Sequence, residues 1–262
     1  MSGSKEERFD IRAEIPSGHV VGFRCENMCK KREDFTLRNI DFEVKPGQIL
    51  RVVGGCGVGK TVLLRTLMGS YRLQRDNGFD QGSISLAGYS SERNRKEYLA
   101  RIGYVLQDLP FDPRSSAFDV GRLYGPDYPG FIPEEYEELL RRFEIPARQK
   151  LRLLSAGQKI LVQFAFAMSC HPKLILLDEP AGCLDVDFCA SVFGILRKRV
   201  QEEACCVILT GAPDRGTEEI ADRILCLDKD DDGAYQKFFG TVQEARERFA
   251  ETECREEGEQ GT

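Results

Sequence analysis

The sequence predicts an α/β fold built on a largely parallel sheet, and three observations support this prediction. A glycine-rich loop at 54–61 lies between a strand-like run and a helix-like run. The apolar run 174–177 is followed directly by two acidic residues, and such a run is typical of a strand buried in a parallel sheet. Helix-like and strand-like segments then alternate as far as residue 227, as an α/β sheet requires.

The glycine-rich loop matches the phosphate-binding P-loop pattern. Its glycines let the backbone curl so that successive N–H groups point at phosphate oxygens, Lys60 supplies a cation, and the Thr61 hydroxyl is a ligand for Mg²⁺. A strand expected over 48–53 and a helix expected over 62–68 place the loop at a helix N-terminus, where anions are favoured. The residues predicted to hold the nucleotide here are Gly54, Gly55, Cys56, Gly57, Val58, Gly59, Lys60, Thr61 and Val62.

Shorter patterns predict the remaining strands and helices. Near the N-terminus, apolar and polar residues alternate in patches, which suggests antiparallel strands at 20–23, 35–37 and 40–44. Beyond the loop, strands are expected at 82–88, 102–106, 207–209 and 224–227, and helices at 92–101 and 186–203.

The segment 107–170 differs from the rest of the chain because prolines divide it into short pieces. Pro133 opens a helix whose first turn carries acidic residues, which is a favourable helix start. We therefore expect a helical subdomain over 107–170 within a single domain at 18–248. The polar ends, 1–17 and 249–262, are expected to be flexible.

Composition excludes several classes of protein. No apolar run reaches the roughly 18 residues of a membrane span, and the N-terminus has no signal-peptide core, so we expect a cytoplasmic protein. The net charge of −6 argues against nucleic acid as the main partner. The ten cysteines are scattered without a metal-binding spacing, which favours reduced, buried thiols over disulfides or zinc.

An acidic pair, Asp178-Glu179, follows the apolar run 174–177. In enzymes with a P-loop, such an aspartate holds Mg²⁺, and an adjacent glutamate acts as general base on the attacking water. A helix cap or a turn is the alternative interpretation, and the pair alone leaves both open.

A third motif decides between these interpretations. Leu154-Ser155-Ala156-Gly157-Gln158 resembles the Leu-Ser-Gly-Gly-Gln signature of ATP-binding cassette (ABC) ATPases, with Ala156 in place of the first glycine, and it stands between the P-loop and the acidic pair. The run 102–107 resembles the family's strand ending in the Q-loop glutamine, here Gln107. Segments 181–185 and 221–224 resemble the D-loop and the segment before the last core strand. The resemblance covers about residues 20 to 248 and is nearest to bacterial exporter ATPases with separate membrane subunits.

The resemblance implies a P-loop NTPase (RecA-like) core with an antiparallel β subdomain and an inserted α-helical subdomain. It also implies two cassettes facing head to tail, with each ATP held by the P-loop of one and the signature of the other. In this arrangement Glu179 polarises the water and Gln107 contacts Mg²⁺ or the water. The implied metal ligands are Thr61, Gln107 and Asp178, and the implied nucleotide contacts from the second cassette are Ser155, Ala156, Gly157, Gln158 and Asp185.

Two departures from the family pattern concern the nucleotide. The family's histidine after the strand at 207–209 is replaced by Gly211, and neither histidine of the chain, His19 or His171, can align there. The aromatic residue that stacks on adenine is also missing, because basic residues occupy 31–32. Phe35 or Phe23 could replace it, although core packing is the more common role of a phenylalanine.

The sequence thus predicts the ATP-binding and ATP-hydrolysing subunit of a bacterial ABC transporter, working as a homodimer or heterodimer on a membrane permease at the inner face of the membrane. A non-transport ABC ATPase of translation or DNA repair is the alternative, but those proteins usually carry two cassettes or a long coiled coil. A hydrolysis-impaired regulatory subunit is the third interpretation, and Gly211 favours it whereas Glu179 opposes it.

Overall fold

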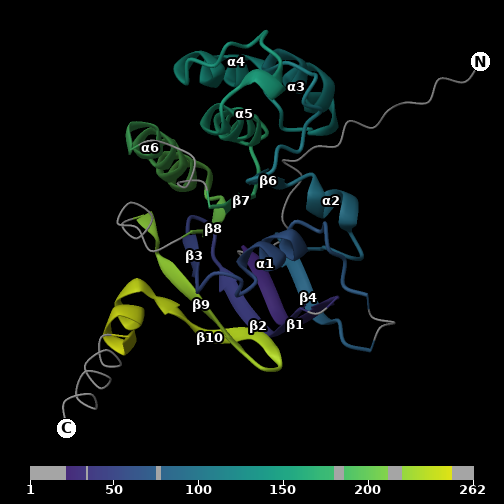
Figure 1. Cartoon of the computed structure of the whole chain (residues 1–262), viewed down its shortest axis with the longest axis vertical. Helices are drawn as coiled ribbons and strands as arrows, with labels where there is room; N and C mark the ends of the chain where they lie inside the picture. Colours follow the sequence, from purple (N-terminus) through teal and green to yellow (C-terminus); the bar gives the residue numbers. More distant parts are fainter. Residues whose placement is uncertain (1–21, 34, 75–77, 180–185, 212–219, 250–262) are drawn as a thin grey trace, which may run out of the picture.

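A ten-stranded mixed sheet organises the molecule, in the order β5-β4-β1-β2-β10-β9-β3-β8-β7-β6 (Figure 1). The computed structural model describes residues 22–33, 35–74, 78–179, 186–211 and 220–249. The strands are β1 (Phe23–Arg32), β2 (Phe35–Val44), β3 (Ile49–Val53), β4 (Gln81–Leu86), β5 (Tyr89–Ser90), β6 (Ile102–Val105), β7 (Leu174–Asp178), β8 (Cys206–Thr210), β9 (Arg223–Asp230) and β10 (Gly233–Thr241). The helices are α1 (Lys60–Leu67), α2 (Arg95–Leu99), α3 (Ala117–Tyr124), α4 (Pro133–Arg142), α5 (Ala156–Ser169) and α6 (Val186–Glu203), with short 3₁₀ turns η2 (Gly125–Asp127) and η3 (Leu151–Leu153).

The half of the sheet that carries the predicted chemistry is parallel. β3 pairs with β8 and β9, and β7 pairs with β6 and β8, all in parallel. The carboxyl ends of these strands therefore meet at one edge, where ligands bind in α/β sheets. The other half is antiparallel through β1, β2 and β4, with β10 antiparallel to β9. The predicted α/β fold with an antiparallel subdomain is confirmed.

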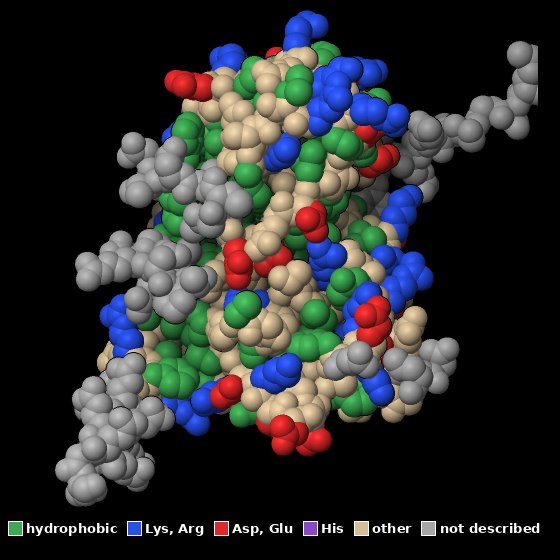
Figure 2. Space-filling model, viewed as in Figure 1, with side chains coloured by type: hydrophobic (Ala, Val, Ile, Leu, Met, Phe, Trp, Pro, Cys, Tyr) green, Lys and Arg blue, Asp and Glu red, His purple; other side chains and the backbone are tan. Residues whose placement is uncertain are grey.

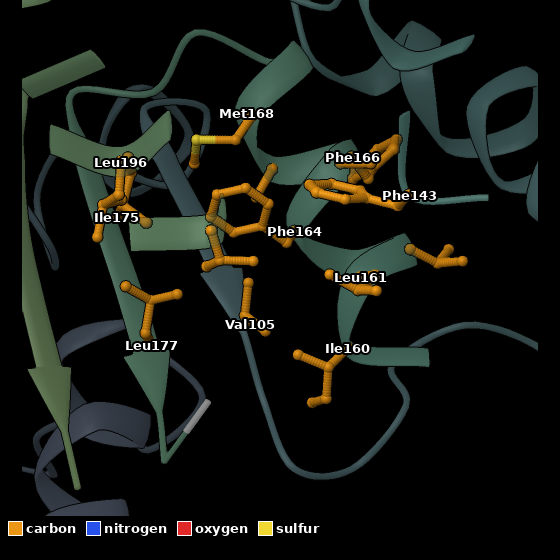
Figure 3. Close-up of a cluster of buried hydrophobic side chains, with 14 of the residues drawn as sticks. Val105, Phe143, Ile160, Leu161, Phe164, Phe166, Met168, Ile175, Leu177 and Leu196 are labelled. Atoms are coloured by element: carbon orange, nitrogen blue, oxygen red, sulfur yellow. The ribbon is translucent and has the colours of Figure 1, made fainter. Parts of the chain in front are cut away.

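Both faces of the parallel sheet are buried, which explains the uninterrupted apolar runs 174–177 in β7 and 206–209 in β8. In β7, Ile175 and Leu177 face one hydrophobic cluster, whereas Leu174 and Leu176 face the other. The first cluster joins the sheet to α5 and α6, and Figure 3 shows Ile175 and Leu177 on β7 with Phe164 and Leu161 of α5. The second cluster joins it to α1 and the antiparallel strands.

The helical subdomain forms as expected between β6 and β7. Figure 1 shows α3, α4 and α5 grouped above the edge of the sheet that ends in β6. Pro133 begins α4 with Glu134 and Glu135 in the first turn, as the sequence predicts. None of the helices in the described part of the chain has the length and hydrophobicity needed to cross a bilayer.

Some elements differ from the sequence predictions. The helix expected over 92–101 is only α2, because the chain before it turns at Ser90, whose Oγ accepts from the N–H groups of Glu92 and Arg93. β10 and a helix at 242–249 were not predicted, and the strand expected at 20–23 overlaps β1 only at Phe23, because β1 continues to Arg32. The last residue of that helix, Phe249, falls in the tail expected to be flexible, whereas 1–17 and 250–262 lie outside the described residues.

Candidate functional site

The glycine-rich loop connects β3 to α1 at the carboxyl edge of the parallel sheet, as the motif predicts. Two of its glycines are required by the backbone. Gly59, which caps α1, has a φ of +93°, and a Cβ there would lie 2.3 Å from the Phe35 ring. Gly54 has a φ of +151°, and its Cβ would lie 2.7 Å from the Leu227 carbonyl oxygen. A side chain at either position would push the loop away from these neighbours, whereas glycine lets the backbone pack against them.

The loop presents hydrogen-bond donors that have no partner. The N–H groups of Gly59, Lys60 and Thr61 have no acceptor among the described residues, since the first helical N–H bond runs from Leu63 to the Gly59 carbonyl. The first N–H groups of a helix are left without intrahelical partners. Together with the positive end of the helix dipole, they form a cradle for an anion.

Lys60 lies within this cradle. Its ammonium group donates to the carbonyl oxygens of Gly54 at 2.9 Å and Gly55 at 3.2 Å, and it lies 3.8 Å from the Glu179 carboxylate. The lysine side chain is only 11% exposed. The cation is thus held at the loop, where an anion in the cradle would meet it.

The acidic pair ends β7 beside the loop, so both residues reach the place the sequence predicted for them. Asp178 is almost fully buried, and its Oδ1 accepts from the Thr61 hydroxyl at 3.4 Å. Glu179 is more open, and its Oε2 accepts from the Gln107 side-chain amide at 2.9 Å. Lys60, Thr61, Asp178, Glu179 and Gln107 therefore form one constellation from three separate parts of the chain.

The donor set of this constellation fits Mg²⁺. Mg²⁺ prefers hard oxygen ligands and keeps several waters, so one hydroxyl and one carboxylate from the protein suffice beside a phosphate. Thr61 and Asp178 supply these groups within hydrogen-bond distance of each other. Gln107 adds an exposed side chain at the edge, with its amide nitrogen committed to Glu179.

The signature motif begins α5 and does not join this constellation within one chain. Ser155 Oγ accepts from the Gln158 N–H at 3.1 Å, and Gln158 Oε1 accepts from the Ser155 N–H at 3.0 Å, which is a capping box. No hydrogen bond or ion pair between described residues links 155–158 to the P-loop. Ser155 and Ala156 are exposed, and Gly157 is half-buried, so the motif is open to a second molecule. Asp185 lies outside the described residues.

Gly211 lies directly after β8 and is buried. A Cβ built at this glycine meets no atom within 4 Å. The position that carries histidine in the family therefore has room for a side chain.

The two phenylalanines considered for adenine differ in their surroundings. Phe23 is 1% exposed and packs against Phe42 at a centroid distance of 5.7 Å, so it is a core residue. Phe35 is half-buried, and its ring lies against Gly59 of the P-loop. Arg32, one of the basic residues at the usual aromatic position, stacks on Tyr71 at 4.1 Å. Only Phe35 thus remains a candidate.

The cysteines of the described chain are all free. Most are buried, and burial raises the pKa of Cys205 to about 11 and that of Cys206 to about 12, which keeps both as thiols. Cys56, in the P-loop, is the exposed exception among them. The structure thus agrees with the expectation that most of these thiols are buried.

His171, which cannot align with the family's histidine, belongs to an ionic cluster between helices. Its ring nitrogens lie 3.1 Å from carboxylate oxygens of Glu135 in α4 and Glu203 in α6, and Arg199 pairs with both carboxylates. This ionic cluster joins the helical subdomain to the core. Sequence patterns missed it because its members are far apart in the chain.

The helical subdomain carries a separate apolar groove of about 810 Å³ between α3 and α4. Phe118, Tyr136 and Leu140 line it, and Arg122, Arg141 and Arg148 also border it. Figure 2 shows Lys and Arg side chains gathered over this end of the molecule. The P-loop does not line the groove, so the phosphate cradle and the groove are different surfaces.

Comparison with known proteins agrees with this geometry. The family described as ABC transporter matches residues 37–182, more than half of the chain. The chain is 29% identical over 239 residues to the L-cystine transport system ATP-binding protein TcyN of Escherichia coli (strain K12), covering 85% of this chain and 94% of that protein.

Solved structures have the same fold. An ATP-binding subunit of an ABC transporter matches with a TM-score of 0.76 at 21% identity, covering 88% of this chain and 94% of that one. A dimeric ATP-binding cassette, MJ0796, bound to ADP and phosphate, matches with a TM-score of 0.71 at 21% identity, covering 84% and 98%. The predicted P-loop NTPase core is thereby confirmed. The chain belongs to the ABC transporter family, as one of its ATP-binding cassette proteins.

Proposed function

We propose that this chain binds MgATP at the P-loop constellation and hydrolyses it to drive a separate membrane permease. As a member of its family, the chain is an ATPase and the ATP-binding subunit of a transporter. The observation that carries the assignment of the site is the set of N–H groups at Gly59, Lys60 and Thr61, which have no acceptor in the described part of the chain, beside a held ammonium group. These groups suit the phosphates of a nucleotide.

The residues divide the chemistry among them. Lys60 and the loop amides neutralise and orient the phosphates. Thr61 and Asp178 would hold Mg²⁺, which when bound neutralises charge developing on the phosphates. Glu179 takes a proton from the attacking water, and Gln107 keeps the Glu179 carboxylate oriented through the 2.9 Å hydrogen bond.

A second cassette completes the site in this proposal. Ser155, Ala156, Gly157 and Gln158 are remote from the P-loop of their own chain but accessible, as a motif acting on a partner's nucleotide must be. The dimeric cassette that shares the fold supports this arrangement. Attachment to a permease would place the chain on the cytoplasmic face of a membrane. The placement among exporters stays a prediction, as does a single domain over 18–248.

The Lys60→Ala variant tests the site. Removing the ammonium group deletes a charge-assisted contact with phosphate, which is worth about 1.5–3 kcal/mol, so we expect ATP affinity to fall by about 10- to 150-fold. Isothermal titration calorimetry with MgATP measures this change. Lys198→Ala, on the exposed surface of α6, is the matched control and should leave affinity unchanged. Equal ATP affinity in Lys60→Ala and Lys198→Ala would contradict the assignment.

A further inference from the structure

Thr210, which the sequence analysis did not single out, touches both members of the acidic pair. It ends β8 and is fully buried. β8 and β7 pair in parallel, and their register places Thr210 opposite Asp178. Its side chain therefore lies beside that of Asp178 at the carboxyl edge of the sheet.

The hydrogen bonds of the Thr210 hydroxyl have only one possible direction. The Glu179 backbone N–H lies 3.1 Å from Thr210 Oγ1, and an N–H can only donate. The hydroxyl proton is then free for Asp178 Oδ1, which accepts it at 2.7 Å. An ionised carboxylate can only accept, so the two bonds agree. One buried hydroxyl thus bridges the carboxylate at position 178 and the backbone at position 179.

This bridge holds Glu179 in an unusual conformation. Glu179 has a φ of +48°, in the left-handed region that residues with a Cβ occupy at a cost of about 1–2 kcal/mol. Its N–H is shared between the hydroxyl of Thr210 and the Thr210 carbonyl oxygen at 3.2 Å. Anchored in this way, the backbone directs the Glu179 carboxylate to Gln107 and Lys60.

The same bridge determines which carboxylate oxygen of Asp178 remains open. Oδ1 accepts from both Thr210 and Thr61, whereas Oδ2 has no hydrogen-bond partner among the described residues. A fixed carboxylate with one uncommitted oxygen is suited to orienting a metal or its waters, and the groups that fix such ligands strongly affect metal affinity.

We propose that Thr210 is a positioning residue of the ATPase site: its hydroxyl sets the Asp178 carboxylate for Mg²⁺ and holds the turn that aims Glu179 at the attacking water. The proposal rests on the ATPase function argued above. The rival explanation is structural, since a buried threonine hydroxyl also satisfies polar groups at a strand end.

The Thr210→Val variant separates the two explanations because valine keeps the shape and removes the hydroxyl. We expect the gain in ATP affinity on adding Mg²⁺ to fall by about 10- to 100-fold, whereas affinity for ATP in excess EDTA stays at the wild-type value, since Lys60 and the loop amides are intact. Calorimetry with ATP in EDTA and in MgCl₂ gives both affinities. The kcat for ATP hydrolysis should also fall by about 10- to 100-fold.

Two further variants make the test specific. Thr66→Val removes another buried hydroxyl, one that bonds only to the Val62 carbonyl within α1, and it should change neither the Mg²⁺ dependence nor kcat. Thr210→Ser keeps the hydroxyl and should restore both. If Thr210→Val does not fold, Thr210→Ala removes the same hydroxyl with a smaller side chain.

Two results would overturn the proposal. One is a full Mg²⁺-dependent gain in affinity together with wild-type kcat in Thr210→Val or Thr210→Ala. The other is a Thr210→Ser variant as defective as Thr210→Val, because keeping the hydroxyl would then not preserve function and any change of the side chain at this buried position would explain the loss. Failure of the nucleotide site itself would look different, since Lys60→Ala would then leave ATP affinity unchanged in EDTA as well as in MgCl₂.

Discussion

At the scale of single residues, the site combines groups that the family pattern predicts with one that it does not. Lys60, Thr61, Asp178 and Glu179 meet as their motifs predict. Gly211 departs from the pattern, because it brings no side chain to the place where the family has histidine. Without that polar group, we expect positioning of the attacking water to depend on Glu179 and its neighbours.

We expect the Gly211→His variant to hydrolyse ATP faster than the wild-type protein. Nothing lies within 4 Å of a Cβ at this position, so the imidazole has room to enter the site. One well-placed polar group in such a site is worth about 2.7–4 kcal/mol, so kcat should rise by as much as about 100- to 1000-fold. Steady-state phosphate release measures the rate, with Gly211→Ala as a control that should match the wild type. A wild-type rate that histidine does not raise would show that this residue is dispensable here.

Alkylation of Cys56 should block ATP binding, and ATP should protect this thiol. Cys56 is exposed within the phosphate cradle, so an added carbamidomethyl group would occupy the space of the phosphates. Mass spectrometry of the peptide after iodoacetamide treatment, with and without MgATP, measures protection. Cys189 in α6 is the internal control and should react equally in both samples. The same extent of Cys56 labelling with and without ATP would count against a nucleotide at this loop.

The role of a residue could be predicted only where the residue belongs to a short sequence motif. The P-loop, the acidic pair and Gln107 each lie in a short run whose residue types have chemical meaning. Thr210 could not be found in this way, because its role depends on the register between two strands that are far apart in the sequence. The polar residue that ends the apolar run at 206–210, beside the strand of Asp178, is the signal that could have indicated it.

At the scale of elements, two helices of the helical subdomain begin with the same arrangement of hydrogen bonds. α3 and α5 both begin with a capping box, formed by Ser116 with Asp119 and by Ser155 with Gln158. The hydrogen bonds of Ser116 to Asp119 lower the pKa of that carboxyl. Both caps therefore stabilise the helical subdomain, whatever else Ser155 does.

Ser155→Ala and Ser116→Ala should each lower the free energy of unfolding by about 1 kcal/mol, because each removes one capping hydroxyl. Urea denaturation measures this loss. In the presence of MgATP and the slow Glu179→Gln background, only Ser155→Ala should weaken dimerisation, measured by sedimentation velocity. If the two serine variants weakened dimerisation equally, Ser155 would act only as a helix cap.

The two strands that the sequence predicts least well, β1 and β10, share a physical cause. β1 and β10 contain register shifts, between Cys25 and Met28 and between Gln236 and Phe238, which interrupt the alternation that identifies a strand. Asp231 and Asp232 form the β9–β10 turn, and Gly233, at a φ of +124°, begins β10 directly after them. That Asp-Gly pair was a usable hairpin signal. By contrast, β7 and β8 were predictable because burial on both faces makes their runs 174–177 and 206–209 continuously apolar.

At the scale of the whole molecule, the sheet divides the protein into regions with different tasks. The antiparallel half covers α1 and the P-loop, and the parallel half supplies Asp178, Glu179 and Thr210 at one edge. The helical subdomain presents the signature at the start of α5, and the His171 cluster ties it to α6. Its position relative to a second cassette could not be predicted from one chain, because the contacts that set it lie between molecules.

The central claim is that this chain hydrolyses ATP with Glu179 as the general base, and steady-state phosphate release by the wild type and Glu179→Gln tests it most directly. We predict Mg²⁺-dependent hydrolysis by the wild type. In Glu179→Gln, kcat should fall by about 100- to 10,000-fold, since a general base contributes that much, while ATP affinity is retained. Wild-type hydrolysis in Glu179→Gln at unchanged ATP affinity would contradict the account.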